Sequence, residues 1–290
     1  NNKLSEQMHK KSALNAHLIP FFGKFLISEI TNQRVEEFKA AKLKSKLKAK
    51  TINNLTSILA KCLRSAVEWE IVDKIPRIQK LKVPPYKYDF LTETEENILI
   101  SSAHGVWREM LTVAVDTGLR LGELAALDWP SINFAKNEII VRRSFTVKQM
   151  SAPKSNRERR IPITNRVCQM LQSKSEGIGL IFTIEPGMPL LQNRCRNNLL
   201  RICKKAGLRP LIWHTLRHTF ATRLVSHGAS IKALQELMGH SDIQTTMRYA
   251  HLECNVLNDT IDILNKIQTF GQQVVNTPQK QKINAAHSRQ

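Results

Sequence analysis

The chain has 290 residues and carries 44 Lys and Arg against 24 Asp and Glu, which gives a formal net charge of +20. This length suggests two domains, because soluble domains commonly contain ~100–200 residues. Hydrophobic residues make up 42% of the chain, with only 11 glycines and 11 prolines, so collagen-like and wholly disordered classes are excluded. The positive charge requires a polyanionic partner or strong solvation.

Neither a membrane span nor a secretion signal is predicted. Every apolar run falls far short of the ~20 residues that cross a bilayer. No apolar segment follows the polar, basic residues 1–12. The five cysteines are an odd number without a CxxC pair, which favours reduced, packed thiols over a disulfide framework. We therefore expect a cytoplasmic protein.

The first part of the chain has the spacing of amphipathic helices. Thr31 is the expected N-cap of a helix that carries Val35 and Phe38, and Thr51 is the expected N-cap of the next helix. The apolar face of that second helix recurs in three- and four-residue steps at Leu55, Ile58, Leu59, Cys62, Leu63, Ala66 and Val67. Six lysines in residues 39–50 fit either a solvated helix face or a DNA contact.

A basic segment rich in proline divides the chain. Residues 73–89 contain Pro76, Pro84 and Pro85, which end helices and favour an extended connection. The sequence therefore predicts a small helical domain over residues 1–83, followed by a linker to about residue 89.

The second domain is predicted over residues 90–270. Thr92 and Glu95 form a capping box that opens its first helix, and helical spacing continues to Leu127. Branched and aromatic residues in 137–164 then predict a small antiparallel hairpin sheet. Helices return at 192–206, 215–227 and 231–238.

The fold class is therefore mainly α with a small antiparallel β-sheet. Gly207, Gly228 and Gly239 follow the last three predicted helices at C-cap positions. Residues 271–290 are polar and lack aromatics, which predicts a mobile tail.

Arginine and histidine in three separate segments suggest an anion site. The chain has no GxxxxGK loop, GxGxxG, HExxH or acidic calcium loop, so nucleotide-driven and zinc-protease chemistries lose support. Arg120 lies between Gly118 and Gly122 in a tight turn, and Glu123 follows three residues later. This pair is either a buried arginine oriented by a carboxylate or an ordinary pair on a helix surface.

A second segment, His214-Thr-Leu-Arg-His218, starts a predicted helix. His214 and Arg217 are one turn apart, so both can face a phosphate near the helix N-terminus. A metal pair of His214 and His218 ranks below phosphate binding, because no third ligand is adjacent. His218 is expected to be a core histidine.

The third segment runs from Leu237 to His251, with His240 after a glycine and Tyr249 nine residues later. The other two tyrosines of the chain lie in the linker. Tyr249 is therefore the one phenol among cationic and imidazole groups. The alternative is a core aromatic with a satisfied hydroxyl.

The motifs TGLRLGEL, HTLRHTFAT and LMGHSDIQTTMRYAH together resemble the tyrosine recombinases, also called the phage integrase family. That resemblance implies a mixed α/β catalytic domain behind a helical core-binding domain, the two forming a clamp around DNA. It implies an enzyme, a site-specific recombinase or integrase that cleaves and rejoins DNA through a covalent 3′-phosphotyrosyl intermediate. Integration or excision of a mobile element is the expected role.

The resemblance also assigns site residues. Tyr249 matches the nucleophile, while Arg120, Arg217 and His214 match the ligands of the scissile phosphate, with Glu123 in support. His240 and Lys154 complete the set. Lys154 resembles the hairpin lysine that acts as general acid for the leaving 5′ oxygen, although its basic neighbours Lys148, Arg157 and Arg159 are alternatives or simple phosphate contacts.

Elementary chemistry agrees with these roles. Two guanidinium forks can hold the charge that gathers on phosphate oxygens while staying protonated. A free tyrosine has a pKa of ~10, so attack at neutral pH benefits from a positive field and a nearby imidazole such as His240. Because a phosphotyrosine ester retains the exchange energy of the diester, no metal, ATP or other cofactor is expected.

Two other functions remain open. A type IB topoisomerase uses similar chemistry but relaxes supercoils, whereas a noncatalytic DNA-binding regulator would need only the +20 charge and the basic helical half. The resemblance implies double-stranded DNA with specific recombination sites as partner, a homotetramer on two duplexes, DNA-bending accessory proteins and a nucleoid-associated location. Val256, Leu257, Ile261, Leu264 and Ile267 are expected to form an apolar helix face that docks in trans or in cis.

Overall fold

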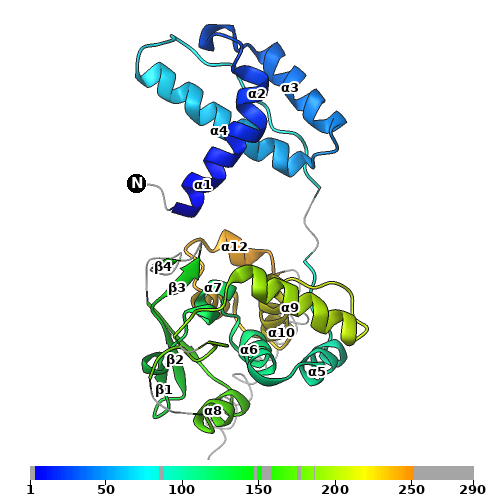
Figure 1. The fold of residues 1–290 in the computed structure, drawn as a ribbon, viewed down its shortest axis with the longest axis vertical. Coiled ribbons are helices and arrows are strands. Elements are labelled where there is room, and N and C mark those ends of the chain that lie inside the picture. Colours follow the sequence, from blue (N-terminus) through cyan, green and yellow to red (C-terminus); the bar gives the residue numbers. More distant parts are fainter. Residues whose placement is uncertain are drawn as a thin grey trace, which may run out of the picture. The chain divides into compact units, whose positions relative to one another are not determined.

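The protein divides into two compact units, one of residues 1–88 with the short segment Thr146–Gln149, the other starting at Asp89. The structure is a computed structural model (Figure 1). It describes residues 4–84, 88–146, 149–151, 158–174, 178–185 and 187–250. The predicted tail and the predicted C-terminal helix face lie outside the described residues. The assignment of the first unit as a core DNA-binding domain stays a prediction.

The first unit is helical in its described part. Its elements are α1 (Leu4–Ala13), η1 (Leu14–Leu18), α2 (Ile19–Phe22), η2 (Ile27–Glu29), α3 (Asn32–Lys44) and α4 (Ala49–Glu68). The Thr31 hydroxyl accepts a hydrogen bond from the backbone N–H of Arg34, so the predicted cap of α3 is confirmed. Thr51 was the wrong cap for α4: the extended residue before that helix is Lys48, and Thr51 already lies inside its first turn.

Aromatic and aliphatic side chains from α2, α3 and α4 form the core of this unit. The rings of Phe22 and Phe38 lie 5.0 Å apart, and Leu55, Leu59 and Leu63 of α4 are buried beside them. Cys62 is exposed, contrary to the expectation of a packed thiol, because it lies at the edge of the α4 apolar face. Cys168, Cys195 and Cys203 are buried as predicted, and Cys254 lies outside the described residues.

The second unit combines helices with short strands. Its helical elements are α5 (Glu93–Ser102), α6 (Gly105–Thr117), α7 (Leu121–Ala125), η3 (Trp129–Ser131), α8 (Asn165–Gln172), α9 (Gln192–Lys205), α10 (Trp213–Ser226), α11 (Ile231–Met238) and α12 (Gln244–Met247). Its strands are β1 (Ile132–Asn133), β2 (Glu138–Val141), β3 (Ser144–Thr146), β4 (Gln149–Ser151) and β5 (Arg159–Pro162). The capping box of Thr92 and Glu95 at the start of α5 is confirmed.

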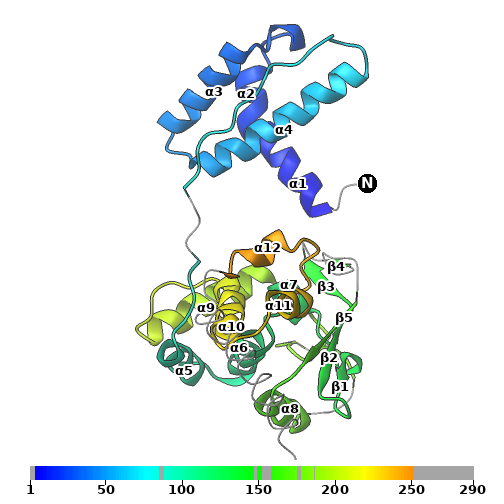
Figure 2. The ribbon, with the colours of Figure 1, turned by 180° about the vertical axis from the view of Figure 1, so that it is seen from behind.

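Strands β1, β2 and β5 form an antiparallel sheet in that spatial order, with Ile139 opposite Ile161. Strands β3 and β4 form a separate two-stranded sheet. Figures 1 and 2 show the larger sheet on the side of this unit where α8 lies, away from α5, α9 and α10. The predicted fold class, mainly α with a small antiparallel sheet, is confirmed.

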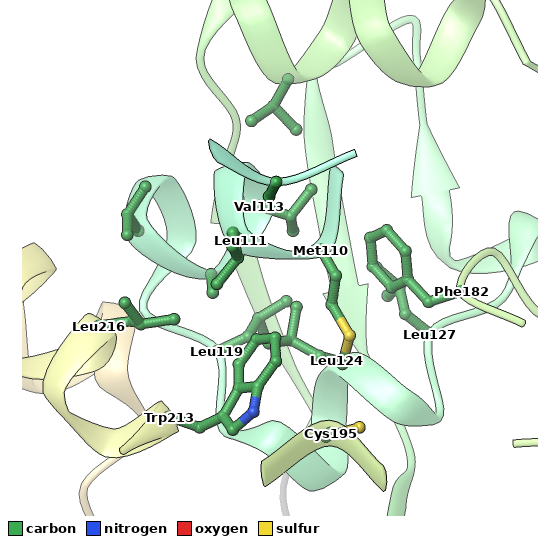
Figure 3. Packing of buried hydrophobic residues seen from close by; sticks show 14 of the residues in the cluster. Met110, Leu111, Val113, Leu119, Leu124, Leu127, Phe182, Cys195, Trp213 and Leu216 are labelled. Carbon is green, nitrogen blue, oxygen red and sulfur yellow. The ribbon is translucent and has the colours of Figure 1, made fainter. Parts of the chain in front are cut away.

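Helix α6 is the centre of the core of this unit. Met110, Leu111 and Val113 are fully buried, and Figure 3 shows them among Leu119, Leu124 and the α10 residues Trp213 and Leu216. Every residue of α6 from Met110 to its last residue, Thr117, is buried. The burial of α6 therefore fixes the turn that follows it, and that turn carries Arg120.

Ion pairs between two buried carboxylates and two partly exposed arginines hold α5, α6, α8 and α10 together. Arg166 of α8 donates to Asp116 at 2.6 Å and to Glu96 at 2.9 Å, while Arg223 of α10 donates to Glu96 at 2.8 Å and to Asp116 at 3.1 Å. Burial by itself would raise the pKa of Asp116, but hydrogen bonds from Arg166 and Thr164 outweigh it, so the pKa is lowered. Asp116 therefore stays charged at neutral pH and anchors the end of α6.

Gly118 ends α6 in the left-handed region with φ +61, and a Cβ there would lie 2.4 Å from the Phe220 ring. Gly118→Ala should therefore lose about 1–2 kcal/mol from the backbone and about 1–3 kcal/mol more from the overlap. Each 1 kcal/mol lost from the free energy of unfolding lowers Tm by about 2–4 °C in a domain of this size.

Gly207→Ala is the matched control, because Gly207 also has positive φ but has open space around its Cα. Thermal melting of both variants should give the larger Tm shift for Gly118→Ala, because only this variant adds the overlap with Phe220. Equal shifts would contradict the close approach of Phe220.

Candidate active site

The predicted site residues come from separate elements of the second unit. Arg120 is the N-cap of α7, His214 and Arg217 lie in the first turns of α10, His240 follows α11, and Tyr249 follows α12. Arg217 donates to the His240 ring, and Arg120 and Arg217 donate to the neighbouring carbonyl oxygens of Gly239 and Met238. Lys154, Lys148 and Arg157 lie outside the described residues.

The carboxyl end of α11 binds three arginines. Three consecutive carbonyl oxygens each accept from a different guanidinium: Leu237 from Arg159 at 3.0 Å, Met238 from Arg217 at 2.5 Å, and Gly239 from Arg120 at 3.2 Å. The last carbonyls of a helix have no partner within the helix, and the helix dipole makes that end attractive to cations. The left-handed conformation of Gly239, φ +62, ends the helix and leaves these carbonyls available.

Glu123 is the buried counter-charge of two of these arginines. Its carboxylate accepts from the Arg120 backbone N–H at 2.8 Å and guanidinium at 2.9 Å, and from two nitrogens of Arg159 at 3.0 and 2.7 Å. Burial alone would raise the pKa of Glu123, but Arg159 and Arg120 outweigh it and lower the pKa to about 2. Arg120 is thus a partly buried arginine oriented by a buried carboxylate, and the pair is not an ordinary one on a helix surface.

Arg159 supports the site by holding Glu123, contrary to the expectation that it contacts phosphate. It was grouped with neighbours that could contact phosphate, yet its side chain is only 8% exposed and forks onto Glu123. A Cβ at Gly239 would lie 2.8 Å from Arg159, so the two segments are packed tightly. No local pattern marks this role, because Glu123 is 36 residues away in the chain.

Arg217 is the most deeply buried cation of the site, with 1% of the residue exposed. It donates to the carbonyl oxygen of Gly118 at 2.5 Å and to Nε2 of His240 at 3.0 Å. Burial, and then the charge of Arg120, lower the pKa of Arg217, which nevertheless stays protonated at neutral pH. A guanidinium only donates, so Nε2 of His240 accepts and its Nδ1–H donates to the Thr246 hydroxyl at 2.9 Å.

This tautomer links the arginine to the tyrosine segment. Thr246 is fully buried, and its carbonyl oxygen accepts from the backbone N–H of Tyr249 at 2.9 Å. Burial and the nearby charge of Arg217 lower the pKa of His240 to about 3, so the ring is neutral at neutral pH. His240 therefore orients the turn that carries Tyr249.

Tyr249 is buried, with its ring packed among Phe220, Leu234 and Met238. Its phenol oxygen lies 2.5 Å from Nδ1 of His218. His218 is buried as expected of a core histidine, but its contact with the phenol was not predicted. The His214 ring, which is exposed, lies edge-on to the His218 ring at 4.8 Å.

The arrangement suits an anion with a reactive phenol beside it. Arg120, Arg159 and Arg217 surround one carboxylate, so the site holds more positive than negative charge among the residues that the structure describes. In the same described part of the chain, no group of three or more His, Cys, Asp or Glu is arranged to hold a metal ion. A hollow of about 640 Å³ borders Gly239 and His240.

Glu123→Gln should change how stability depends on pH. The folded-state pKa of Glu123, about 2, lies below its ordinary value of 4.5, so the carboxylate contributes stability above pH 4.5 that is lost as pH falls toward 2. This contribution is about 3 kcal/mol. In urea denaturation between pH 2.5 and 6, the gap between wild type and variant should shrink with falling pH.

Glu93→Gln is the control, since Glu93 is an exposed carboxylate in the first turn of α5. It should show no comparable gap. A gap for Glu123→Gln that stays constant with pH would contradict the ionised pair.

Known proteins resemble most of this chain. The sequence profile of the phage integrase family matches residues 89–255, which is more than half of the chain. The ICEBs1 integrase of Bacillus subtilis (strain 168) is 26% identical over 92% of this chain and 79% of its own length. Tyrosine recombinase XerC of Pediococcus pentosaceus is 29% identical over 72% of this chain and 74% of its own.

A solved structure shares the fold. The Tn1549 transposon integrase, solved with transposon right end DNA, superposes with a TM-score of 0.76 at 24% identity, over 86% of this chain and 90% of its own. The family profile covers the segments that hold Arg120, Arg217 and Tyr249, and the solved structure shares the fold. The chain belongs to the phage integrase family of tyrosine-type site-specific recombinases.

Proposed function

We propose that this protein integrates or excises a mobile element by cutting and rejoining DNA at specific sites through a bond between Tyr249 and a 3′ phosphate. The observation that carries this proposal is the convergence of Arg120, Arg217 and His240 with the phenol-bearing turn. The names of its relatives support the role, since one is the ICEBs1 integrase and another is a transposon integrase solved with transposon end DNA.

Each site residue has a proposed part. Arg120 and Arg217 hold the non-bridging oxygens of the scissile phosphate, whose charge rises in the transition state. His214, exposed at the start of α10, adds a third ligand near a helix N-terminus. Lys154 protonates the leaving 5′ oxygen. Glu123 and His240 orient the arginines and the tyrosine turn.

The DNA partner is proposed to be two duplexes held by four copies of this chain, with accessory proteins that bend the DNA. Positive charge supports DNA as the partner: the net charge is +20, and Lys44, Lys46, Lys48 and Lys50 of the first unit are exposed. No described helix is long and apolar enough to cross a membrane. A location in the cytoplasm, on the nucleoid, is part of the proposal.

Two competing functions give different products. A type IB topoisomerase would form adducts at scattered sites and relax supercoils, whereas a regulator would bind without any adduct. The mapped sequence of the adducts therefore separates the three functions.

Tyr249→Phe should abolish the covalent protein–DNA adduct and leave DNA binding within about twofold, because only the phenol oxygen is removed. The assay traps adducts under denaturing conditions on fragmented genomic DNA of the source organism and sequences the attached ends. Adducts at one recurrent sequence in wild type alone are expected. A mutant that still forms adducts would exclude Tyr249 as nucleophile.

Metal and nucleotide are expected to be dispensable, because the phosphotyrosyl ester keeps the energy of the broken diester. Adduct formation in EDTA without ATP should proceed within twofold of the rate with Mg²⁺ and ATP. Single-turnover cleavage of a nicked target measures both rates. A tenfold or greater loss in EDTA would overturn this part of the proposal.

A further inference from the structure

Two histidine rings lie near Tyr249: His218 contacts its side chain, and His240 contacts the turn that carries it. The two rings differ in the groups that their nitrogens bind. Nε2 of His240 accepts from Arg217, and its other nitrogen donates to Thr246, so the structure engages both nitrogens of this ring. His218 is the imidazole in contact with the phenol, with Nδ1 at 2.5 Å from the phenol oxygen. Among the residues that the structure describes, His218 therefore lies within hydrogen-bond distance of the reactive phenol oxygen.

The surroundings of His218 keep its ring neutral. Burial, and then the positive field of His214, Arg217 and Arg248, lower the pKa of His218 to about 4, while Asp89 acts in the opposite direction. A neutral imidazole has one nitrogen with a free lone pair. With that lone pair at Nδ1, the ring accepts the hydrogen bond of the phenol.

Helix α10 fixes this contact relative to the phosphate ligands. His218 directly follows Arg217, and both are buried, so the same helical turn positions a guanidinium and the ring that meets the phenol. From the other side, the backbone bond of Tyr249 to Thr246 fixes the tyrosine segment. The tyrosine is thus held by its backbone bond to Thr246, and His218 is held by its place in α10 next to Arg217, which is bonded to Gly118.

We propose that His218 is a catalytic residue, which accepts the phenol proton of Tyr249 at Nδ1 as the phenol oxygen attacks the DNA phosphate. This inference rests on Tyr249 being the nucleophile, as proposed above. In the step, the bond from the phenol oxygen to phosphorus forms and the bond from phosphorus to the 5′ oxygen breaks. The phenol proton moves to His218, and the 5′ oxygen takes a proton from the general acid, Lys154.

Rejoining is the reverse of this step. The 5′ hydroxyl attacks phosphorus and gives its proton to Lys154, the bond from phosphorus to the phenol oxygen breaks, and His218 returns its proton to the departing phenolate. A bound phosphate opposes the positive field of Arg217 at the moment of transfer, which raises the basicity of the ring. One residue therefore serves both directions, without any reagent besides DNA.

The test is His218→Asn, which keeps a hydrogen-bond acceptor near the phenol but cannot take a proton. At neutral pH and saturating protein, single-turnover adduct formation should fall by about 10²–10⁴, the usual effect of losing a general base. DNA affinity should stay within twofold of wild type. The variant should then need tyrosinate, so its rate should rise about tenfold per pH unit toward the phenol pKa of ~10.

His227→Asn is the matched control, because His227 is an exposed histidine at the end of the same helix. It should react at the wild-type rate. A rate for His218→Asn within threefold of wild type would overturn the proposal, as would a loss that is the same at every pH.

A second measurement leaves His218 in place, in case its replacement impairs folding. In ¹⁵N spectra of histidine-labelled protein, Tyr249→Phe should shift the Nδ1 signal of one histidine out of nine. An unchanged spectrum would overturn the contact. Adducts that survive Tyr249→Phe would instead refute the nucleophile, so failure of the proposed function is distinguishable from failure of the His218 assignment.

Discussion

The carboxyl end of α11 is the constraint on which the site depends. Its last carbonyl oxygens are a fixed, partly negative surface, and three guanidiniums from β5, the start of α7 and α10 converge on it. Backbone carbonyls cannot change rotamer, so they hold arginine side chains more rigidly than flexible surface carboxylates would. Two of those arginines are the proposed phosphate ligands, and the third, Arg159, holds the carboxylate that orients Arg120.

Charge balance explains why such a site favours an anion. One buried carboxylate, Glu123, faces Arg120 and Arg159, and the buried Arg217 adds a further positive charge. Burial, and then nearby positive charges that include Arg217, lower the pKa values of His240 and His218, which keeps both imidazoles neutral. A diester phosphate would supply opposite charge while contacting groups that need no further reorganisation, which is the condition for effective transition-state stabilisation.

The scaffold behind the site sets these positions from a distance. Asp116 and Glu96, tied to Arg166 and Arg223, fix the end of α6 against α10. Gly118 lets the Phe220 ring approach the turn closely and presents its carbonyl oxygen to Arg217. Stability and catalysis are therefore coupled in this protein, because the same turn is both a packing contact and a ligand of the buried arginine.

The sequence by itself determined the helical character, the small sheet and the family, and it supplied the candidate site residues. Apolar spacing located helices such as 231–238, and capping chemistry located Thr31 and Thr92, because both signals lie within a few neighbouring residues. The predicted N-cap at Thr51 was wrong, because any short polar residue near the start of a helix resembles a cap in sequence. The motifs around Arg120, Arg217, His240 and Tyr249 were recognisable for the same local reason.

Only the tertiary structure decided how those residues are used. The burial of Arg159, the carbonyls that bind three arginines, the tautomer of His240 and the contact of His218 with Tyr249 each depend on pairs of residues that are 21 to 119 positions apart. Such partnerships arise from packing, and packing leaves no periodic trace along the chain. The sequence alone does not distinguish a histidine that only packs in the core from one, such as His218, that also contacts the proposed nucleophile.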